Sequence, residues 1–105
     1  MKNRIGQGFD VHQLSTGIPL IIGGVSIPFK RGSKGHSDGD VLYHAIVDAL
    51  LGALALGDIG QYFPSTDESY RNVDSCEFLI YTQSLIREKD YEVSNIDATI
   101  ILQEP

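Results

Sequence analysis

Three side chains in the N-terminal half of the chain have the types and the spacing of a metal site. Asp10 and His12 are two positions apart in a stretch that we expect to be extended, where residues i and i+2 point to the same face. His44 lies in a segment with helical periodicity. One carboxylate and two imidazoles suit a Zn²⁺ ion that keeps one coordination position open. For Asp10 and His12 alone, a solvated pair on the surface is the alternative.

Two further carboxylates stand where they could orient His44. Asp40 and Asp48 are four residues before and after it, on the same face of the expected helix. A histidine that binds a metal commonly donates its other ring N–H to a carboxylate. We therefore expect Asp48 or Asp40 to accept a hydrogen bond from His44. A ladder of ion pairs on a helix surface is the alternative.

Polar residues also flank the expected helix at both ends. His36 and Ser37 precede its N-terminus, where backbone N–H groups favour a phosphate. Ser37 and Asp38 could equally be N-cap residues, and His36 could be a surface residue of a loop. Asp58, between Gly57 and Gly60, could bind sugar hydroxyls or orient a second metal, or it could simply belong to a turn after the helix.

The elements that position these residues follow from the apolar pattern. We expect strands at 4–13 and 91–103, and a hairpin of 18–22 and 25–29 that turns at Gly23 and Gly24. One helix should run from Ser37 or Asp38 to about Leu56 and another from Asp74 to about Lys89, with loops at 30–35 and 61–72. The expected buried positions are Leu42, Ile46, Leu50, Ala53 and Leu54, then Phe78, Leu79, Leu85 and Ile86. This order predicts an α/β (α+β) sandwich, with helices packed on one face of a mixed sheet.

The composition limits the kind of partner. The 105 residues suit a single domain, and the formal net charge of -6 disfavours nucleic acid and an anionic membrane. The single cysteine, Cys76, excludes an internal disulfide and suits a reducing cytosol. We expect no targeting segment, no membrane span and a cytoplasmic location. A phosphate ester substrate would need bound cations to neutralise it.

The motifs extend over nearly the whole chain and together resemble the 2-C-methyl-D-erythritol 2,4-cyclodiphosphate synthase family of the non-mevalonate isoprenoid pathway. The matching segments are residues 4–12, 22–28, 35–40, 44–45, 48–53, 57–60, 63–64, 74–75 and 95–101. The resemblance implies a homotrimer with its sheets around the threefold axis and active sites between neighbouring subunits.

The resemblance also implies the roles of individual residues. It implies a Zn²⁺ ion, or Mn²⁺ or Co²⁺, on Asp10, His12 and His44, and Mg²⁺ or Mn²⁺ on the substrate diphosphate. His36 matches a residue that stabilises the transition state. The positions expected to bind substrate are Asp10, Val11, His12, His36, Ser37, Asp58, Ile59, Gly60, Phe63, Pro64, Ser65, Thr66, Asp67, Leu102, Gln103, Glu104 and Pro105.

The implied reaction is that of a phosphorus–oxygen lyase. The enzyme cyclises 4-diphosphocytidyl-2-C-methyl-D-erythritol 2-phosphate to 2-C-methyl-D-erythritol 2,4-cyclodiphosphate and releases CMP. The 2-phosphate of the substrate attacks the β-phosphorus, so no protein nucleophile is required. A zinc-dependent hydrolase with Asp48 or Asp58 as general base is the alternative that the residues alone allow.

The resemblance stops at the end of the chain. The family continues past Pro105 with a lysine-containing nucleotide-binding loop, a helix and a strand that carries a catalytic threonine. We therefore expect this chain to lack the C-terminal segment of the family, and a catalytically incomplete truncated form is a further alternative. We expect a chain that truly ends at Pro105 to be poorly stable and inactive, with the edge of strand 96–102 exposed or covered by another subunit.

Overall fold

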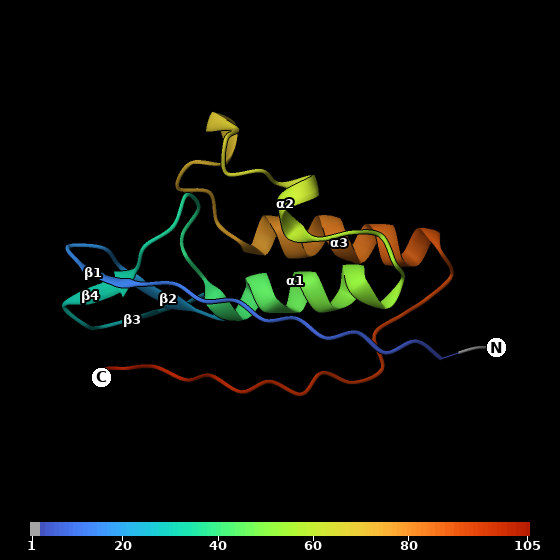
Figure 1. The fold of residues 1–105 in the computed structure, drawn as a ribbon, viewed down its shortest axis with the longest axis horizontal. Coiled ribbons are helices and arrows are strands. Elements are labelled where there is room, and N and C mark those ends of the chain that lie inside the picture. The colour runs from blue at the N-terminus through green and yellow to red at the C-terminus, as the bar shows by residue number, and fades with distance from the viewer. Residues whose placement is uncertain (1–2) are drawn as a thin grey trace.

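The structure is a computed structural model that describes residues 3–105 (Figure 1). Its elements are β1 (Leu14–Thr16), β2 (Leu20–Ile22), β3 (Val25–Ile27), β4 (Arg31–Ser33), α1 (Val41–Ala53), α2 (Ile59–Tyr62), the 3-10 helix η1 (Glu68–Tyr70) and α3 (Cys76–Glu88). Helices and antiparallel strands occupy separate parts of the chain, so the fold is of the α+β class. No helix among the described residues is long and apolar enough to cross a membrane.

The strands form two small antiparallel sheets. β2 pairs with β3, and Leu20 lies opposite Ile27, as expected for the hairpin. Gly23 and Gly24 form its turn with φ angles of 60° and 76°, which residues with a side chain rarely adopt. β1 pairs with β4, and β4 lies in the segment 30–35 that was expected to be a loop. The predicted mixed sheet is therefore wrong for the described residues, where both sheets are two-stranded and antiparallel.

The predicted strands at 4–13 and 91–103 are also wrong as assigned. Both segments run extended in Figure 1, but neither belongs to a described sheet. The first described strand, β1, begins only after residue 13, at Leu14. Alternation of apolar and polar residues favours an extended backbone, but a strand also needs a partner for its N–H and C=O groups. Ile5 and Phe9 are 94% and 80% exposed, so this apolar pattern has no covering layer within the described residues.

Residues 4–13 lie directly against α1. Gly6 and Gly8 make this possible, because a Cβ atom at either position would overlap the carbonyl oxygen of Ala49 or Ala45. Small residues on both sides thus allow the two main chains to approach. This close contact brings the residues that follow Gly8 to the first turns of α1.

The helices begin and end inside their predicted bounds. Asp40 is the N-cap of α1, and its carboxylate accepts a hydrogen bond from Tyr43 N at 3.1 Å. A start at Ser37 or Asp38 is excluded by Gly39, whose φ of 73° is not helical. The predicted loop at 61–72 contains the end of α2 and the whole of η1.

The core lies between α1 and α3, which run side by side in Figure 1. Val47 and Leu51 of α1 pack on Phe78 of α3. For α3, burial of Phe78 and Ile86 is confirmed, and Thr82 joins them because its hydroxyl donates to Phe78 O at 2.8 Å.

The predicted buried face of α1 was wrong. Its buried residues are His44, Val47 and Leu51, and the five predicted ones are only partly buried. Because α3 covers one side of α1 and residues 4–13 cover another, the helix has apolar residues on more than one face. Periodicity alone could not tell which face meets α3.

Candidate metal centre

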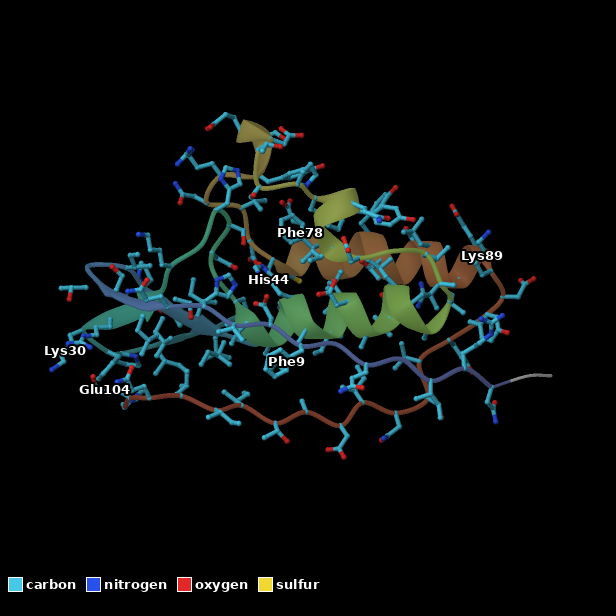
Figure 2. All side chains as sticks on the ribbon, in the orientation of Figure 1. Phe9, Lys30, His44, Phe78, Lys89 and Glu104 are labelled. Carbon is cyan, nitrogen blue, oxygen red and sulfur yellow. The ribbon has the colours of Figure 1, made fainter. Side chains whose placement is uncertain are left out.

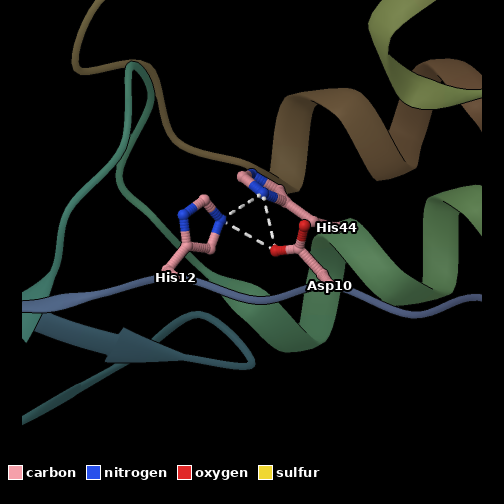
Figure 3. Close-up of side chains that lie close together, drawn as sticks. All are labelled: Asp10, His12 and His44. Carbon is pink, nitrogen blue, oxygen red and sulfur yellow. Dashed lines mark hydrogen bonds and ion pairs between the residues drawn. The ribbon is translucent and has the colours of Figure 1, made fainter.

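Asp10, His12 and His44 converge on one point, as the sequence predicts (Figure 3). Asp10 Oδ2 lies 2.8 Å from His12 Nε2 and 3.4 Å from His44 Nδ1, and the two ring nitrogens are 3.3 Å apart. Ligand atoms at the usual zinc distances in a tetrahedral site are roughly 3.4 Å apart. Two of the three separations match this value, and a small shift of Asp10 from His12 would bring the third to it.

The start of α1 fixes the place of His44. Asp40 is completely buried, and its two carboxylate oxygens accept hydrogen bonds from Gly23 N at 3.0 Å, Gly24 N at 2.8 Å and Tyr43 N at 3.1 Å. These bonds tie the first turn of the helix to the β2–β3 turn. His44, one residue after Tyr43, is thereby held in the first turn of α1, and only 8% of it is exposed.

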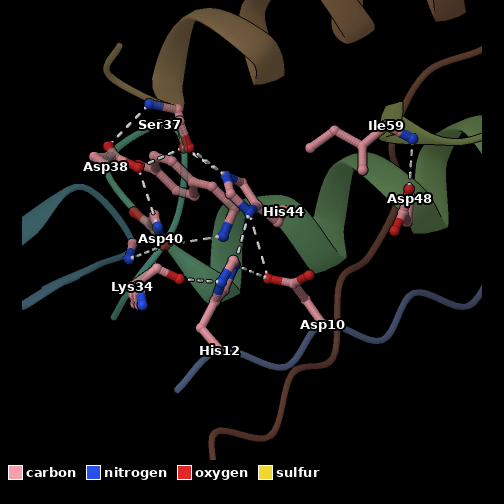
Figure 4. Close-up of polar contacts among 12 residues, drawn as sticks. Asp10, His12, Lys34, Ser37, Asp38, Asp40, His44, Asp48 and Ile59 are labelled. Atoms are coloured by element: carbon pink, nitrogen blue, oxygen red, sulfur yellow. Dashed lines mark hydrogen bonds and ion pairs between the residues drawn. The ribbon is translucent and has the colours of Figure 1, made fainter. Parts of the chain in front are cut away.

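The ring of His12 presents an electron pair to the cluster. Its Nδ1 lies 2.8 Å from the carbonyl oxygen of Lys34, which can only accept, so Nδ1 carries the proton and donates (Figure 4). In the neutral ring Nε2 is then unprotonated and faces Asp10. Asp10 Oδ2 is itself a buried acceptor that makes no aligned hydrogen bond with any described residue, despite its short distance from His12. Acceptors that face each other in this way fit a bound cation.

The charges in the cluster are strongly coupled. Burial raises the pKa of Asp10, but the adjacent imidazoles of His12 and His44 outweigh burial and lower this pKa to about 2. The Asp10 carboxylate, 2.8 Å from the His12 ring, raises the pKa of His12 against the opposing effect of burial. A proton on His12 and a metal ion therefore compete for the same position.

The partner predicted for the second nitrogen of His44 was wrong. His44 Nε2 faces Ser75 Oγ at 2.8 Å. It also faces Ser37 Oγ at 3.1 Å (Figure 4). Asp48 instead accepts a hydrogen bond from Ile59 N at 2.7 Å, and Asp40 is occupied by the backbone groups described above. The ring of His44 points across the interface to the start of α3. The sequence marks Ser75 as a residue near a helix start, which gives no sign of this contact.

Some of the predicted substrate residues lie close together. The ring of His36 donates from Nε2 to the carbonyl oxygen of Asp67 at 2.7 Å, which joins two of the predicted segments. Asp58 caps α2 and accepts from Gln61 N at 3.0 Å. Phe63 stacks on Phe78 with ring centroids 4.3 Å apart, so it has a packing role in the core.

The predicted substrate segment at 102–105 lies elsewhere. Glu104 pairs with Arg31 of β4, with 3.1 Å between Oε1 and Nη1. Figure 2 shows Glu104 near Lys30 at the strand end of the molecule, whereas His44 lies at the beginning of α1. The described structure therefore does not bring this segment to the cluster.

Comparison with known proteins identifies the family. A family model described as the YgbB family matches residues 3–105. The chain belongs to the YgbB family. A curated relative from Clostridium kluyveri (strain NBRC 12016), 2-C-methyl-D-erythritol 2,4-cyclodiphosphate synthase, is 58% identical over 97% of this chain and 62% of its own length. The synthase of the same name from Methylobacillus flagellatus is 60% identical over 97% of this chain and 64% of its own length.

Solved structures of this family have the same fold. A 2C-methyl-D-erythritol-2,4-cyclodiphosphate synthase in a CDP-bound form gives a TM-score of 0.76 at 46% identity, over 83% of this chain and 58% of that one. IspF of Plasmodium falciparum in complex with CDP gives 0.71 at 42% identity, over 88% of this chain and 55% of that one. The YgbB-family chain thus spans less than two thirds of the length of these relatives.

Proposed function

We propose that this YgbB-family chain supplies the metal-binding part of a 2-C-methyl-D-erythritol 2,4-cyclodiphosphate synthase. The enzyme, a lyase, would convert 4-diphosphocytidyl-2-C-methyl-D-erythritol 2-phosphate to the 2,4-cyclodiphosphate and CMP. The observation that carries the proposal is the convergence of Asp10 Oδ2, His12 Nε2 and His44 Nδ1 in a chain whose relatives bear this name.

Asp10, His12 and His44 would hold the metal ion. Zn²⁺ suits one carboxylate and two imidazoles, and Mn²⁺ and Co²⁺ accept the same ligands. When bound, the ion would act as a Lewis acid on phosphate oxygens and orient the substrate. The net charge of -6 supports a role for cations, including Mg²⁺ or Mn²⁺ on the diphosphate, in neutralising the substrate.

His36 would act on the phosphoryl group in the transition state. Since its Nε2 donates to Asp67 O, its Nδ1 could donate to a phosphate oxygen only when the ring is protonated. The protonated imidazole ring of His36 would then stabilise the negative charge that the attacking and leaving oxygens share.

The substrate would be bound by residues on several loops. We propose contacts from residues 10–12, Ser37, 58–60 and 63–67, the segments expected from the sequence. Residues 102–105, which lie apart from the cluster in this structure, would take part in a site formed between neighbouring subunits of a homotrimer. A cytoplasmic location belongs to the same proposal.

Product analysis tests the proposal against a zinc-dependent hydrolase. The two candidate general bases, Asp48 and Asp58, both accept backbone N–H bonds, which disfavours hydrolysis. We expect the zinc-loaded chain, once joined to the rest of a full-length synthase, to release CMP together with an equal amount of cyclodiphosphate. Release of inorganic phosphate without the cyclic product would contradict the proposal.

A chimaera tests whether the 105 residues suffice. The chain is joined to the part of the Clostridium kluyveri synthase that it does not match, and both proteins are assayed for CMP release and oligomeric mass. We expect an active trimer from the chimaera, and metal binding without turnover from the 105 residues alone. A chimaera that binds zinc but forms no cyclodiphosphate would contradict the proposed function.

A further inference from the structure

The hydrogen bonds behind His44 form a chain with a fixed direction. Ser75 is completely buried at the start of α3, and its Oγ lies 2.8 Å from His44 Nε2. On its other side, the same Oγ lies 2.5 Å from Asp38 Oδ1. The second oxygen of Asp38 accepts a hydrogen bond from Ser75 N at 2.9 Å, so the carboxylate accepts two hydrogen bonds from Ser75.

The Asp38 carboxylate, at the end of this series of hydrogen bonds, determines where the protons lie. An ionised carboxylate only accepts, so the single hydroxyl proton of Ser75 is donated to Asp38. Ser75 Oγ then has only electron pairs left for His44, and His44 must donate from Nε2. In the neutral ring this leaves Nδ1 unprotonated, and Nδ1 is the atom that faces Asp10 and His12.

We propose that Asp38 and Ser75 are positioning residues that fix His44 in its Nε2–H tautomer and so keep Nδ1 ready to bind a metal. This inference rests on the proposed metal site. The carbonyl of Lys34 fixes the opposite tautomer of His12, with the proton on Nδ1. Lys34 O and Ser75 Oγ, which lie outside the cluster, thus each accept the ring proton of one histidine. One unprotonated nitrogen of each ring therefore faces Asp10.

Backbone hydrogen bonds of Asp38 and its neighbours also connect the metal site to the loop that carries His36. Asp38 N donates to Val73 O at 3.0 Å, and Asn72 N donates to His36 O at 2.8 Å. These backbone hydrogen bonds connect residues 36–38 to residues 72–75. Movement of either segment would therefore disturb both the orientation of His44 and the place of His36.

The first test is the tautomer of His44 in the metal-free protein. Two-bond ¹H–¹⁵N correlation spectra distinguish Nε2–H from Nδ1–H when recorded above the pH at which the histidines titrate. We expect wild-type His44 to show Nε2–H and His12 to show Nδ1–H. A predominant Nδ1–H form of His44 in the wild type would overturn the proposal without any variant.

The second test compares Ser75→Ala with Ser37→Ala. Ser37 Oγ lies at a similar distance from His44 Nε2, 3.1 Å, but its hydrogen bonds in this structure do not include one to Asp38, so it is the matched control. We expect Ser75→Ala to mix the tautomers of His44 and to weaken Zn²⁺ binding by about 10- to 100-fold in calorimetric titration. Ser37→Ala should change neither strongly.

The outcomes separate this inference from the proposed function. If the wild type binds no Zn²⁺, the metal function fails, whereas the tautomer measurement still tests Ser75 and Asp38. If the wild type binds Zn²⁺ and Ser75→Ala binds it equally well with an unchanged tautomer, the positioning role is refuted. Equal effects of Ser75→Ala and Ser37→Ala would also refute it.

Discussion

The Nε2 atom of His44 lies 2.8 Å from the hydroxyl of Ser75, across the interface between α1 and α3. The packing of two helices thus positions a candidate metal ligand through its Nε2 atom, while residues 4–13 bring Asp10 and His12 to its Nδ1 atom. The stability of this interface and the geometry of the site should therefore change together.

Removal of the helix ligand should abolish metal retention. We expect His44→Ala to lose its bound zinc on dialysis, because Asp10 and His12 alone leave two coordination positions to water. Elemental analysis of the purified variant provides the measurement. One zinc per chain in His44→Ala would show that the ion binds elsewhere.

A methyl group at Gly8 should separate residues 4–13 from α1. Because its Cβ would overlap Ala45 O, we expect Gly8→Ala to lower the free energy of unfolding by about 1–3 kcal/mol and to weaken zinc binding. Urea unfolding and zinc titration measure the two effects. Gly52→Ala is the control, since a Cβ there would lie 4.0 Å from Gln7 O and alanine favours the helix. Equal stability of the two variants would contradict the close contact.

Loss of the Asp40 carboxylate should release both the helix start and the hairpin turn. Asp40→Ala leaves Gly23 N, Gly24 N and Tyr43 N without their acceptor, at a cost of about 1–3 kcal/mol for each buried group that water does not reach. Asp40→Asn keeps one of the two oxygens and should fall between Asp40→Ala and wild type. The order of the three urea midpoints checks this, and an Asp40→Ala protein as stable as wild type would disprove it.

Asp48 should make stability depend on pH. Burial raises the pKa of Asp48, and the hydrogen bond from Ile59 N offsets only part of this effect. The folded state therefore holds the proton more tightly than the unfolded chain. The stabilisation is complete below the ordinary pKa of 3.8 and is lost as the pH rises through the folded pKa.

Asp48→Asn removes this charge and keeps an acceptor for Ile59 N. We expect the variant to be more stable than wild type at neutral pH, with a difference that shrinks as the pH falls toward 3.8. Urea unfolding at a series of pH values measures it. Asp97→Asn, at an exposed carboxylate, controls for the change in net charge. A difference that grows toward acid pH would contradict the sign of the shift.

The sequence by itself determined much of the candidate metal centre. Asp10 and His12 share a face because alternate residues of any extended segment do so, whether or not it joins a sheet. The glycine turn of the hairpin and the small residues along α1 were likewise visible, because turn geometry and side-chain volume are local properties. The wrong assignment of residues 4–13 as a strand therefore did not affect the prediction of the ligands.

Tertiary structure decided which groups support those ligands. The i±4 rule favoured Asp40 and Asp48 as partners of His44, but each of them serves backbone N–H groups elsewhere. The actual partner, Ser75, lies 31 residues away, on the other side of a helix interface. Hydrogen-bond direction and strand pairing both depend on which group from a distant segment arrives opposite a given atom. The spacing of residues along one segment does not predict such a contact, so it can be found only in the folded chain.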